Sequence, residues 1–132
     1  MTRINLIPPQ ELTRQHLVAE YRELPRTFAL IKNWQKRPTT LPEQFTMGTG
    51  HVRFFYNKAS FLVNRQRKLI EEMLSRGYSP QHKEYMELFA GIDMGLQIIW
   101  APVPADIAVS RARIEHRLAE QGARELALRG IN

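Results

Sequence analysis

The sequence predicts an all-α protein, a single compact domain over residues 1–132 with three main helices and long ordered loops. Three segments repeat apolar residues at the spacing of an amphipathic helix. Strand-like patterning is confined to His51–Tyr56, and no partner strand is apparent. The chain has 132 residues, the size of one ordinary domain, and no repeat or linker divides it.

The first helix is predicted from Pro9 or Gln10 to Trp34. At about 100° per residue its large apolar side chains fall in one narrow stripe, which we expect to face the core. These core residues are Leu17, Tyr21, Leu24, Phe28 and Ile31. The other side carries His16, Glu20, Arg22, Glu23 and Arg26. The segment therefore predicts a helix with a core face and a charged face.

The second helix is predicted from Lys58 to Arg76, with Gly77 as the left-handed residue after its end. The third begins near Pro104 or Asp106 and is expected to stop at Gly122. Candidate core residues are Phe61, Leu62, Leu69, Ile70, Met73 and Leu74 in the second helix, and Ile107, Ile114 and Leu118 in the third.

Two connections are harder to assign. The segment Arg37–Tyr56 is rich in Pro, Thr and Gly and is predicted to be a long ordered loop, a kind of segment that is often functional. The segment Glu84–Trp100 is apolar enough for a short helix, but Gly91 and Gly95 interrupt it, so helix and loop both remain open there.

The charge of the chain is uneven. The formal net charge is +6, and residues 1–66 hold ten basic and four acidic side chains, whereas residues 67–132 hold nine of each. A basic excess confined to one half favours a surface that meets a polyanion.

Composition also excludes several classes of protein. The chain has no cysteine, and its four histidines lie more than thirty residues apart, so we expect no disulfide, no thiolate chemistry and no structural metal. It has no apolar run of membrane-spanning length, and its first residues lack the apolar core of a signal peptide. We therefore expect an intracellular, cytoplasmic protein without a membrane segment.

The start of the chain offers a nucleophile. Thr2 is small enough for Met1 to be removed, which would free its α-amine. An α-amine has a lower pKa than a lysine side chain, and Arg3, with Arg22 or Arg26 if they fold close, would lower it further. The Thr2 amine is therefore a candidate for imine formation with an aldehyde carbon, although every chain has such an amine.

Glu23 lies between Arg22 and Arg26 on the charged face of the first helix. A carboxylate among cations suits the stabilisation of a sugar cation or the transfer of a proton. The alternative is an exposed helix face with an ordinary Glu23–Arg26 ion pair. His16 shares this face, and as a lone histidine it favours a polar contact over a catalytic base.

Basic residues of the later helices are candidates for contacts to a phosphate backbone. They are Lys58, Arg65, Arg67, Lys68 and Arg76 in the second helix, and Arg111, Arg113 and Arg117 in the third. Arg113 and Arg117 are four residues apart and share a helix face. The alternative is an ordinary solvated surface.

Several short blocks, in order along residues 1–120, resemble one known family. The most specific are Met1-Thr2-Arg3-Ile4-Asn5-Leu6, His16 and Ala19-Glu20-Tyr21-Arg22-Glu23-Leu24-Pro25-Arg26. Further matches are Gly48-x-Gly50-His51-Val52-x-Phe54-Phe55-Tyr56-x-Lys58, Phe61-Leu62, Arg65-Gln66, Leu69-Ile70, Arg76-Gly77 and Ile107-Ala108-x-Ser110-x-Ala112-Arg113. On these residues the chain resembles the phage-type pyrimidine-dimer DNA glycosylases.

The resemblance implies an all-α domain that cleaves an N-glycosidic bond and then nicks the resulting abasic site. It implies that the Thr2 amine forms the imine and that Glu23 accepts the proton for β-elimination and supports the sugar cation. It also implies DNA contacts by Arg3, Arg22, Arg26, Arg113 and Arg117, with Gln15 and His16 lining the same pocket. The implied partner is damaged double-stranded DNA, from which a base is flipped. No metal, no organic cofactor and no obligate protein partner is implied, and we expect a monomer.

Two stretches depart from the family pattern. The family ends in an aromatic, basic tail, whereas residues 121–132 contain no aromatic residue, and residues 77–103 match poorly. The tail helps the family to engage damaged DNA through stacking contacts. Three functions therefore remain open: action on pyrimidine dimers, the same imine chemistry on another damaged base or on abasic sites alone, and a non-catalytic helical DNA-binding module.

Overall fold

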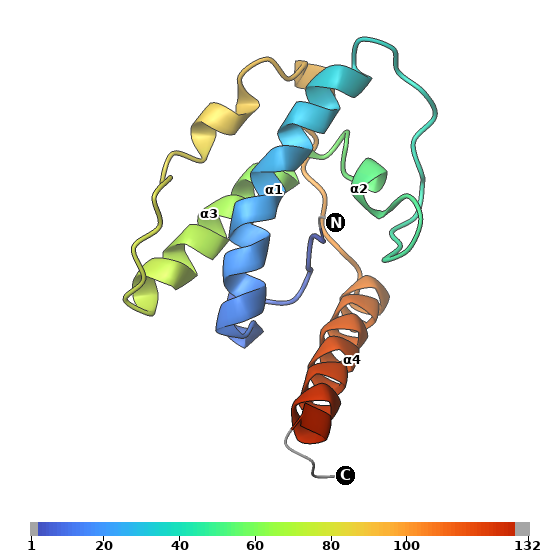
Figure 1. The fold of residues 1–132 in the computed structure, drawn as a ribbon. Coiled ribbons are helices and arrows are strands. Elements are labelled where there is room, and N and C mark those ends of the chain that lie inside the picture. The colour runs from blue at the N-terminus through green and yellow to red at the C-terminus, as the bar shows by residue number, and fades with distance from the viewer. Residues whose placement is uncertain (1–2, 129–132) are drawn as a thin grey trace.

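The computed structural model describes residues 3–128, and this range contains four α-helices, three short 3₁₀ helices and no strand. α1 (Arg14–Trp34) and α3 (Ala59–Ser75) pack side by side, α2 (His51–Phe54) lies on the other side of α1, and α4 (Pro104–Leu128) extends away from the body (Figure 1). The prediction of an all-α fold with three main helices is confirmed.

α1 begins at Arg14, so the predicted start at Pro9 or Gln10 is wrong. The Thr13 hydroxyl accepts the His16 N–H at 3.3 Å and caps the helix there. The residues before the cap form a separate 3₁₀ turn, η1 (Pro9–Glu11). The predicted core stripe is confirmed, because Leu17, Tyr21, Leu24, Phe28 and Ile31 are all buried.

α3 matches its prediction to within one residue at each end, and Gly77 follows it with a φ of +83°. α4 instead runs past the expected stop at Gly122 to Leu128. One internal glycine costs a helix about 1 kcal/mol, and the Ala, Arg, Glu and Leu residues around it favour the helix. Of the predicted atypical tail 121–132, the part to Leu128 is thus helical, and 129–132 lie outside the described residues. Leu74 and Leu118, predicted for the core, are exposed.

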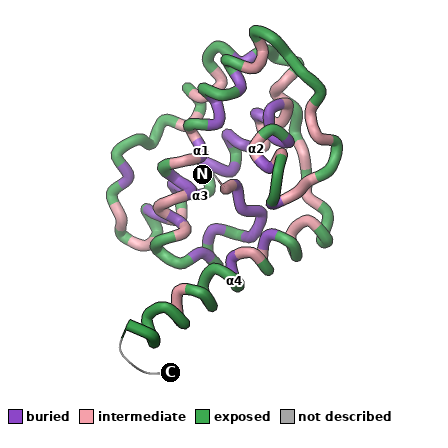
Figure 2. Tube along the Cα trace, turned by 45° about the vertical axis from the view of Figure 1, so that its right-hand side comes forward, coloured by how far each residue is buried: buried purple, intermediate pink, exposed green. Residues whose placement is uncertain are grey.

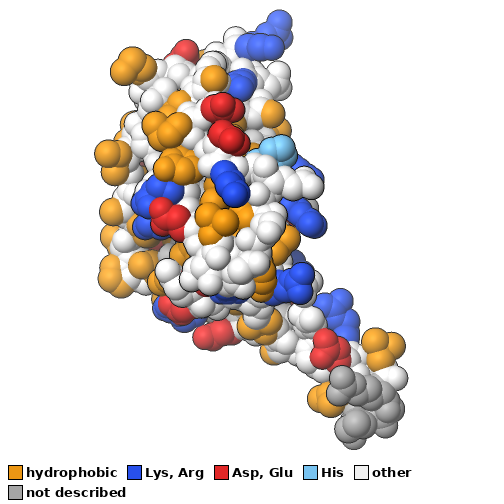
Figure 3. All heavy atoms as spheres, turned by 90° about the vertical axis from the view of Figure 1, so that its left-hand side faces the viewer, with side chains coloured by type: hydrophobic (Ala, Val, Ile, Leu, Met, Phe, Trp, Pro, Cys, Tyr) orange, Lys and Arg blue, Asp and Glu red, His pale blue; other side chains and the backbone are white. Residues whose placement is uncertain are grey.

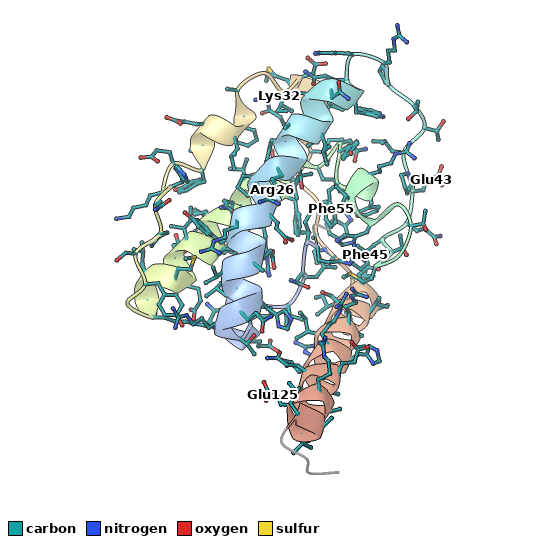
Figure 4. All side chains as sticks on the ribbon, in the orientation of Figure 1. Arg26, Lys32, Glu43, Phe45, Phe55 and Glu125 are labelled. Carbon is teal, nitrogen blue, oxygen red and sulfur yellow. The ribbon has the colours of Figure 1, made fainter. Side chains whose placement is uncertain are left out.

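The strand-like segment His51–Tyr56 is in fact helical and contains α2. Gly50 initiates this turn with a φ of +87°. This turn contributes to an aromatic cluster, in which the Phe45 and Phe55 ring centroids are 6.1 Å apart (Figure 4). The cluster consists of Phe45, Phe54, Phe55, Phe61 and Trp100. Packing of aromatic rings, rather than strand pairing, accounts for the apolar pattern of this segment.

The segment left open at Glu84–Trp100 forms two 3₁₀ turns, η2 (Met86–Phe89) and η3 (Met94–Leu96). η2 packs against α1 and α3. On the face that α3 and this segment form, acidic side chains lie beside basic ones (Figure 3). No helix within residues 3–128 is long and apolar enough to cross a membrane.

An extended N-terminal segment, Arg3–Pro8, passes through the middle of the fold. Its residues Ile4, Leu6 and Ile7 are buried, with at most 8% of their surface exposed. In Figure 2 the buried parts of the trace gather around this segment, whereas the last turns of α4 are exposed. The segment therefore belongs to the core and brings Arg3 to the place where α1 and α4 approach each other.

Candidate active site

A cavity of about 520 Å³ opens where the N-terminal segment, α1 and the first half of α4 meet. Its lining residues are Arg3, Asn5, Gln15, His16, Ala19, Glu20, Glu23, Arg113, Ile114 and Arg117. On α1 these residues succeed one another at intervals of three and four, so they share a face of the helix. We call this space the central cavity.

Two hydrogen bonds hold the backbone that leads into the central cavity. The Ile4 N–H donates to His51 Nε2 at 2.9 Å, and the Leu6 N–H donates to Ser110 Oγ at 2.9 Å. Because His51 belongs to α2 and Ser110 to α4, two distant parts of the chain fix this segment. Arg3 is thereby held at the cavity wall.

A buried ion pair holds the same segment from the other side. Arg65 on α3 donates to both carboxylate oxygens of Glu20, at 2.7 and 3.0 Å, and to the Ile7 carbonyl oxygen at 2.6 Å. The Asn5 amide donates to Glu20 at 2.8 Å. Glu20 is only 2% exposed, so its predicted place on the charged face is wrong. Its position between Leu17 and Leu24 at helical spacing could have indicated burial.

Three arginines give the central cavity its positive charge. They are Arg3 from the N-terminal segment and Arg113 and Arg117 from α4. Partial burial lowers the pKa of Arg3, the charges of Arg113 and Arg117 lower it further, and Glu23 opposes them. Mutual repulsion of these guanidinium groups favours a bound anion, which would relieve it.

Glu23 lies on the α1 wall of this cavity and is half-buried. The alternative of a Glu23–Arg26 ion pair does not hold: within residues 3–128 Glu23 forms no salt bridge. Arg26 is exposed one turn further along α1 (Figure 4). Glu23 is thus a carboxylate on the cavity wall that no basic residue of its own helix neutralises.

Gln15 and His16 form the end of the cavity nearest the start of α1. His16 Nδ1 lies 3.1 Å from the Thr13 hydroxyl. Partial burial lowers the pKa of His16, and the charge of Arg117 lowers it further. A neutral imidazole is therefore favoured there, which can both donate and accept a hydrogen bond.

His51 was part of the family pattern but was not predicted as a site residue. Burial lowers its pKa to about 4, a hydrogen bond to the Thr46 carbonyl opposes this, and Arg3 and Arg113 lower it further. The charges of these arginines connect His51 to the cavity electrostatically, although it does not line it.

The remaining predicted residues are Thr2, Arg22 and Arg26. Thr2 is outside the described residues. Arg22 is exposed and lines a separate cavity of about 430 Å³ with Tyr21, Pro25 and Gln66. Arg26 is exposed outside both cavities. Six of the nine site residues predicted from the sequence thus line the central cavity, namely Arg3, Gln15, His16, Glu23, Arg113 and Arg117.

Several basic residues considered for phosphate contacts have acidic partners instead. Arg65 is buried against Glu20, Arg76 pairs with Glu72 at 2.7 Å, Arg67 pairs with Glu71 at 2.7 Å, and Arg111 pairs with Glu11 at 3.0 Å. Within the described range, no group of three or more His, Asp or Glu side chains is arranged to hold a metal ion.

The fold and the cavity define a small helical protein with a cationic site that contains one available carboxylate. Comparison with protein families identifies the class of that site. The family model described as pyrimidine dimer DNA glycosylase matches residues 1–86 of the 132-residue chain. The chain belongs to this family. Membership implies DNA binding and DNA glycosylase activity, and the matched range includes the N-terminal segment, α1, α2 and α3.

Proposed function

We propose that this protein is a base-excision repair enzyme that cleaves the glycosidic bond at pyrimidine dimers in duplex DNA and then nicks the abasic site. The observation that carries the proposal is the central cavity, in which Glu23 and Arg3 line one space. Thr2 is bonded directly to Arg3, so once Met1 is removed the Thr2 α-amine is the nearest amine along the chain. The proposal assigns the nucleophile to Thr2 and the base to Glu23.

The first step forms the imine. The Thr2 nitrogen attacks C1′ of the damaged nucleotide, and the C1′–N bond breaks with its electron pair leaving on the base, which takes up a proton. The C1′–O4′ bond then breaks with its electron pair leaving on O4′, which takes up the proton that the nitrogen loses, and an imine between C1′ and the Thr2 nitrogen results. Glu23 supports the positive charge that develops on the sugar in this step.

The second step breaks the strand. The imine withdraws electrons and acidifies C2′–H, the Glu23 carboxylate takes this proton, and the C3′–O bond breaks with its electrons leaving on the phosphate. Arg3, Arg113 and Arg117 would bind backbone phosphates around the sugar. The scheme needs neither a metal nor an organic cofactor, and one copy of the chain suffices.

Borohydride trapping tests the proposal. With borohydride, the enzyme and an abasic-site duplex should form a covalent protein–DNA adduct, because reduction converts the imine into a stable amine. Chemical blocking of the Thr2 α-amine should abolish the adduct, and mass spectrometry of the intact protein should find Met1 removed. A preparation that cleaves DNA but gives no adduct would contradict the imine, and one that only binds DNA would indicate a non-catalytic module.

A second target is favoured by one observation. The family match ends at residue 86 and does not include α4, and α4 has no Phe, Trp or Tyr that could stack on a lesion. The same chemistry could therefore serve another damaged base or abasic sites alone. Strand cleavage of ultraviolet-irradiated, alkylated and abasic duplexes, measured side by side, separates these targets. If irradiated DNA is cleaved no faster than undamaged DNA, pyrimidine dimers are excluded as the substrate.

A further inference from the structure

A second cavity, of about 470 Å³, lies at the C-terminal end of α1, where α2 and the loop between them approach it. We call it the end cavity. It is lined by Leu30, Asn33, Trp34, Lys36, Arg37, Arg53 and Tyr56. Three of these residues are basic and none is acidic. Elsewhere on the surface, by contrast, Arg67, Arg76 and Arg111 are neutralised by glutamates.

The end cavity holds one of its guanidinium groups in a fixed position. Arg53 Nη2 donates to the Thr39 hydroxyl at 2.9 Å and to the Thr40 carbonyl oxygen at 2.6 Å. The Trp34 indole N–H donates to the same Thr39 hydroxyl at 3.1 Å. Within residues 3–128, Nε and Nη1 of Arg53 have no partner, so each can donate to a phosphate oxygen from a guanidinium that is already ordered.

One face of α1 connects the two cavities. Ala19 and Glu23 line the central cavity, Leu30 and Asn33 line the end cavity, and the exposed Arg26 lies between them. These residues follow at intervals of three and four and therefore share a side of the helix. Asn33 lies ten residues after Glu23, about 15 Å along the axis. That distance corresponds to about four base pairs of duplex DNA.

We infer that the end cavity binds the phosphate backbone of the duplex about four base pairs from the nucleotide in the central cavity, through Arg37 and Arg53. Charge complementarity and continuity along α1 carry this inference, which rests on the proposed function. A duplex lying along α1 would meet the central cavity, Arg26 and the end cavity in succession. The end cavity thus adds affinity for the DNA beside the lesion, independent of its sequence.

The test measures binding of the full-length protein to abasic-analogue duplexes by fluorescence anisotropy over a range of salt concentrations. One duplex extends a full turn on both sides of the analogue, and two others stop about two base pairs from it on one side or the other. The test variant carries Arg37→Gln and Arg53→Gln, and Arg37→Gln alone serves as a second variant that leaves the Thr39 contacts intact. The matched control carries Lys83→Gln and Arg124→Gln, two exposed basic residues that line neither the central cavity nor the end cavity.

On the long duplex, the slope of log affinity against log salt is negative, and the double variant should reduce its magnitude by about 2 and the single variant by about 1. The control should leave the slope unchanged, and truncation on one of the two sides should abolish the difference. An unchanged slope, an equal loss in the control, or a loss that persists on both truncated duplexes would overturn the inference. If the variants change the salt slope as expected but the wild-type protein cleaves no DNA, the proposed function fails while this inference stands. If the wild-type protein cleaves DNA but the variants leave the salt slope unchanged, this inference fails while the proposed function stands.

Discussion

His51 holds the backbone of Ile4 through its imidazole ring. Nε2 accepts the Ile4 N–H at 2.9 Å, and Nδ1 lies 2.8 Å from the Thr46 carbonyl oxygen, to which it donates. Both ring nitrogens are thus used, in the only neutral form that can satisfy both partners. Because Ile4 follows Arg3, this bond orients the residues that enter the central cavity.

Replacement of His51 should therefore destabilise the protein and misplace its N-terminus. His51→Phe keeps an aromatic ring beside Phe45 and Phe55 but leaves the buried Ile4 N–H and the Thr46 carbonyl without this partner. We expect the free energy of unfolding, measured by urea denaturation, to fall by about 2–4 kcal/mol.

Ser110→Ala is the matched control, because it frees the Leu6 N–H two residues further from the cavity. It should cost about 1–2 kcal/mol of unfolding free energy. At a temperature where both variants are folded, only His51→Phe should slow borohydride trapping under single-turnover conditions. Equal rates for the two variants would show that His51 has a structural role alone.

The same histidine predicts how stability depends on pH. Its pKa is about 4 in the folded protein and 6.5 when unperturbed, so between these values the unfolded chain binds a proton that the folded chain does not. The stability that His51 contributes is fully present above pH 6.5 and is lost as the pH falls to about 4, by about 3 kcal/mol in total. The difference in unfolding free energy between wild type and His51→Phe should shrink over this window, and a constant difference would contradict the assignment.

Much of this arrangement could be predicted from the sequence, because helix periodicity depends on local spacing. The core stripe of α1 and the ends of α3 follow from apolar residues three and four apart. The partners of His51 and Glu20 could not be predicted in this way, although the helical spacing of Glu20 with Leu17 and Leu24 indicates burial. Each is polar and buried because of a partner far along the chain, Ile4 for His51 and Arg65 for Glu20. Only the tertiary fold brings such partners together.

The buried Glu20–Arg65 pair should be a major determinant of stability. Glu20→Gln would leave Arg65, which is 5% exposed, without its counter-charge, and we expect a loss of about 3–5 kcal/mol in the free energy of unfolding. Glu71→Gln, which removes an exposed pair with Arg67, should cost less than about 0.5 kcal/mol. Thermal and urea denaturation measure both, and similar losses would show that the Glu20–Arg65 pair is not buried in solution.

The arginines of α4 should act on DNA affinity rather than on folding. Arg113→Gln and Arg117→Gln should each reduce the magnitude of the salt slope of duplex binding by about 1, because each removes one phosphate contact. Arg111→Gln is the control on the same helix, since Arg111 already pairs with Glu11 and does not line the central cavity. A salt slope that changes equally in all three variants would mean that α4 contributes only general charge.

Glu23→Gln separates binding from chemistry. The amide has nearly the shape of the carboxylate but cannot accept the C2′ proton, and a general base contributes about 10²–10⁴-fold to a rate. Strand cleavage of an abasic duplex should therefore fall at least about 100-fold, while anisotropy should report wild-type or tighter DNA binding, because a negative charge has left the cationic cavity. Glu115→Gln, which removes the same charge from an exposed position on α4, should cleave at the wild-type rate. Cleavage by Glu23→Gln at the wild-type rate would rule out Glu23 as the base, and a parallel loss of binding would assign it to structure instead.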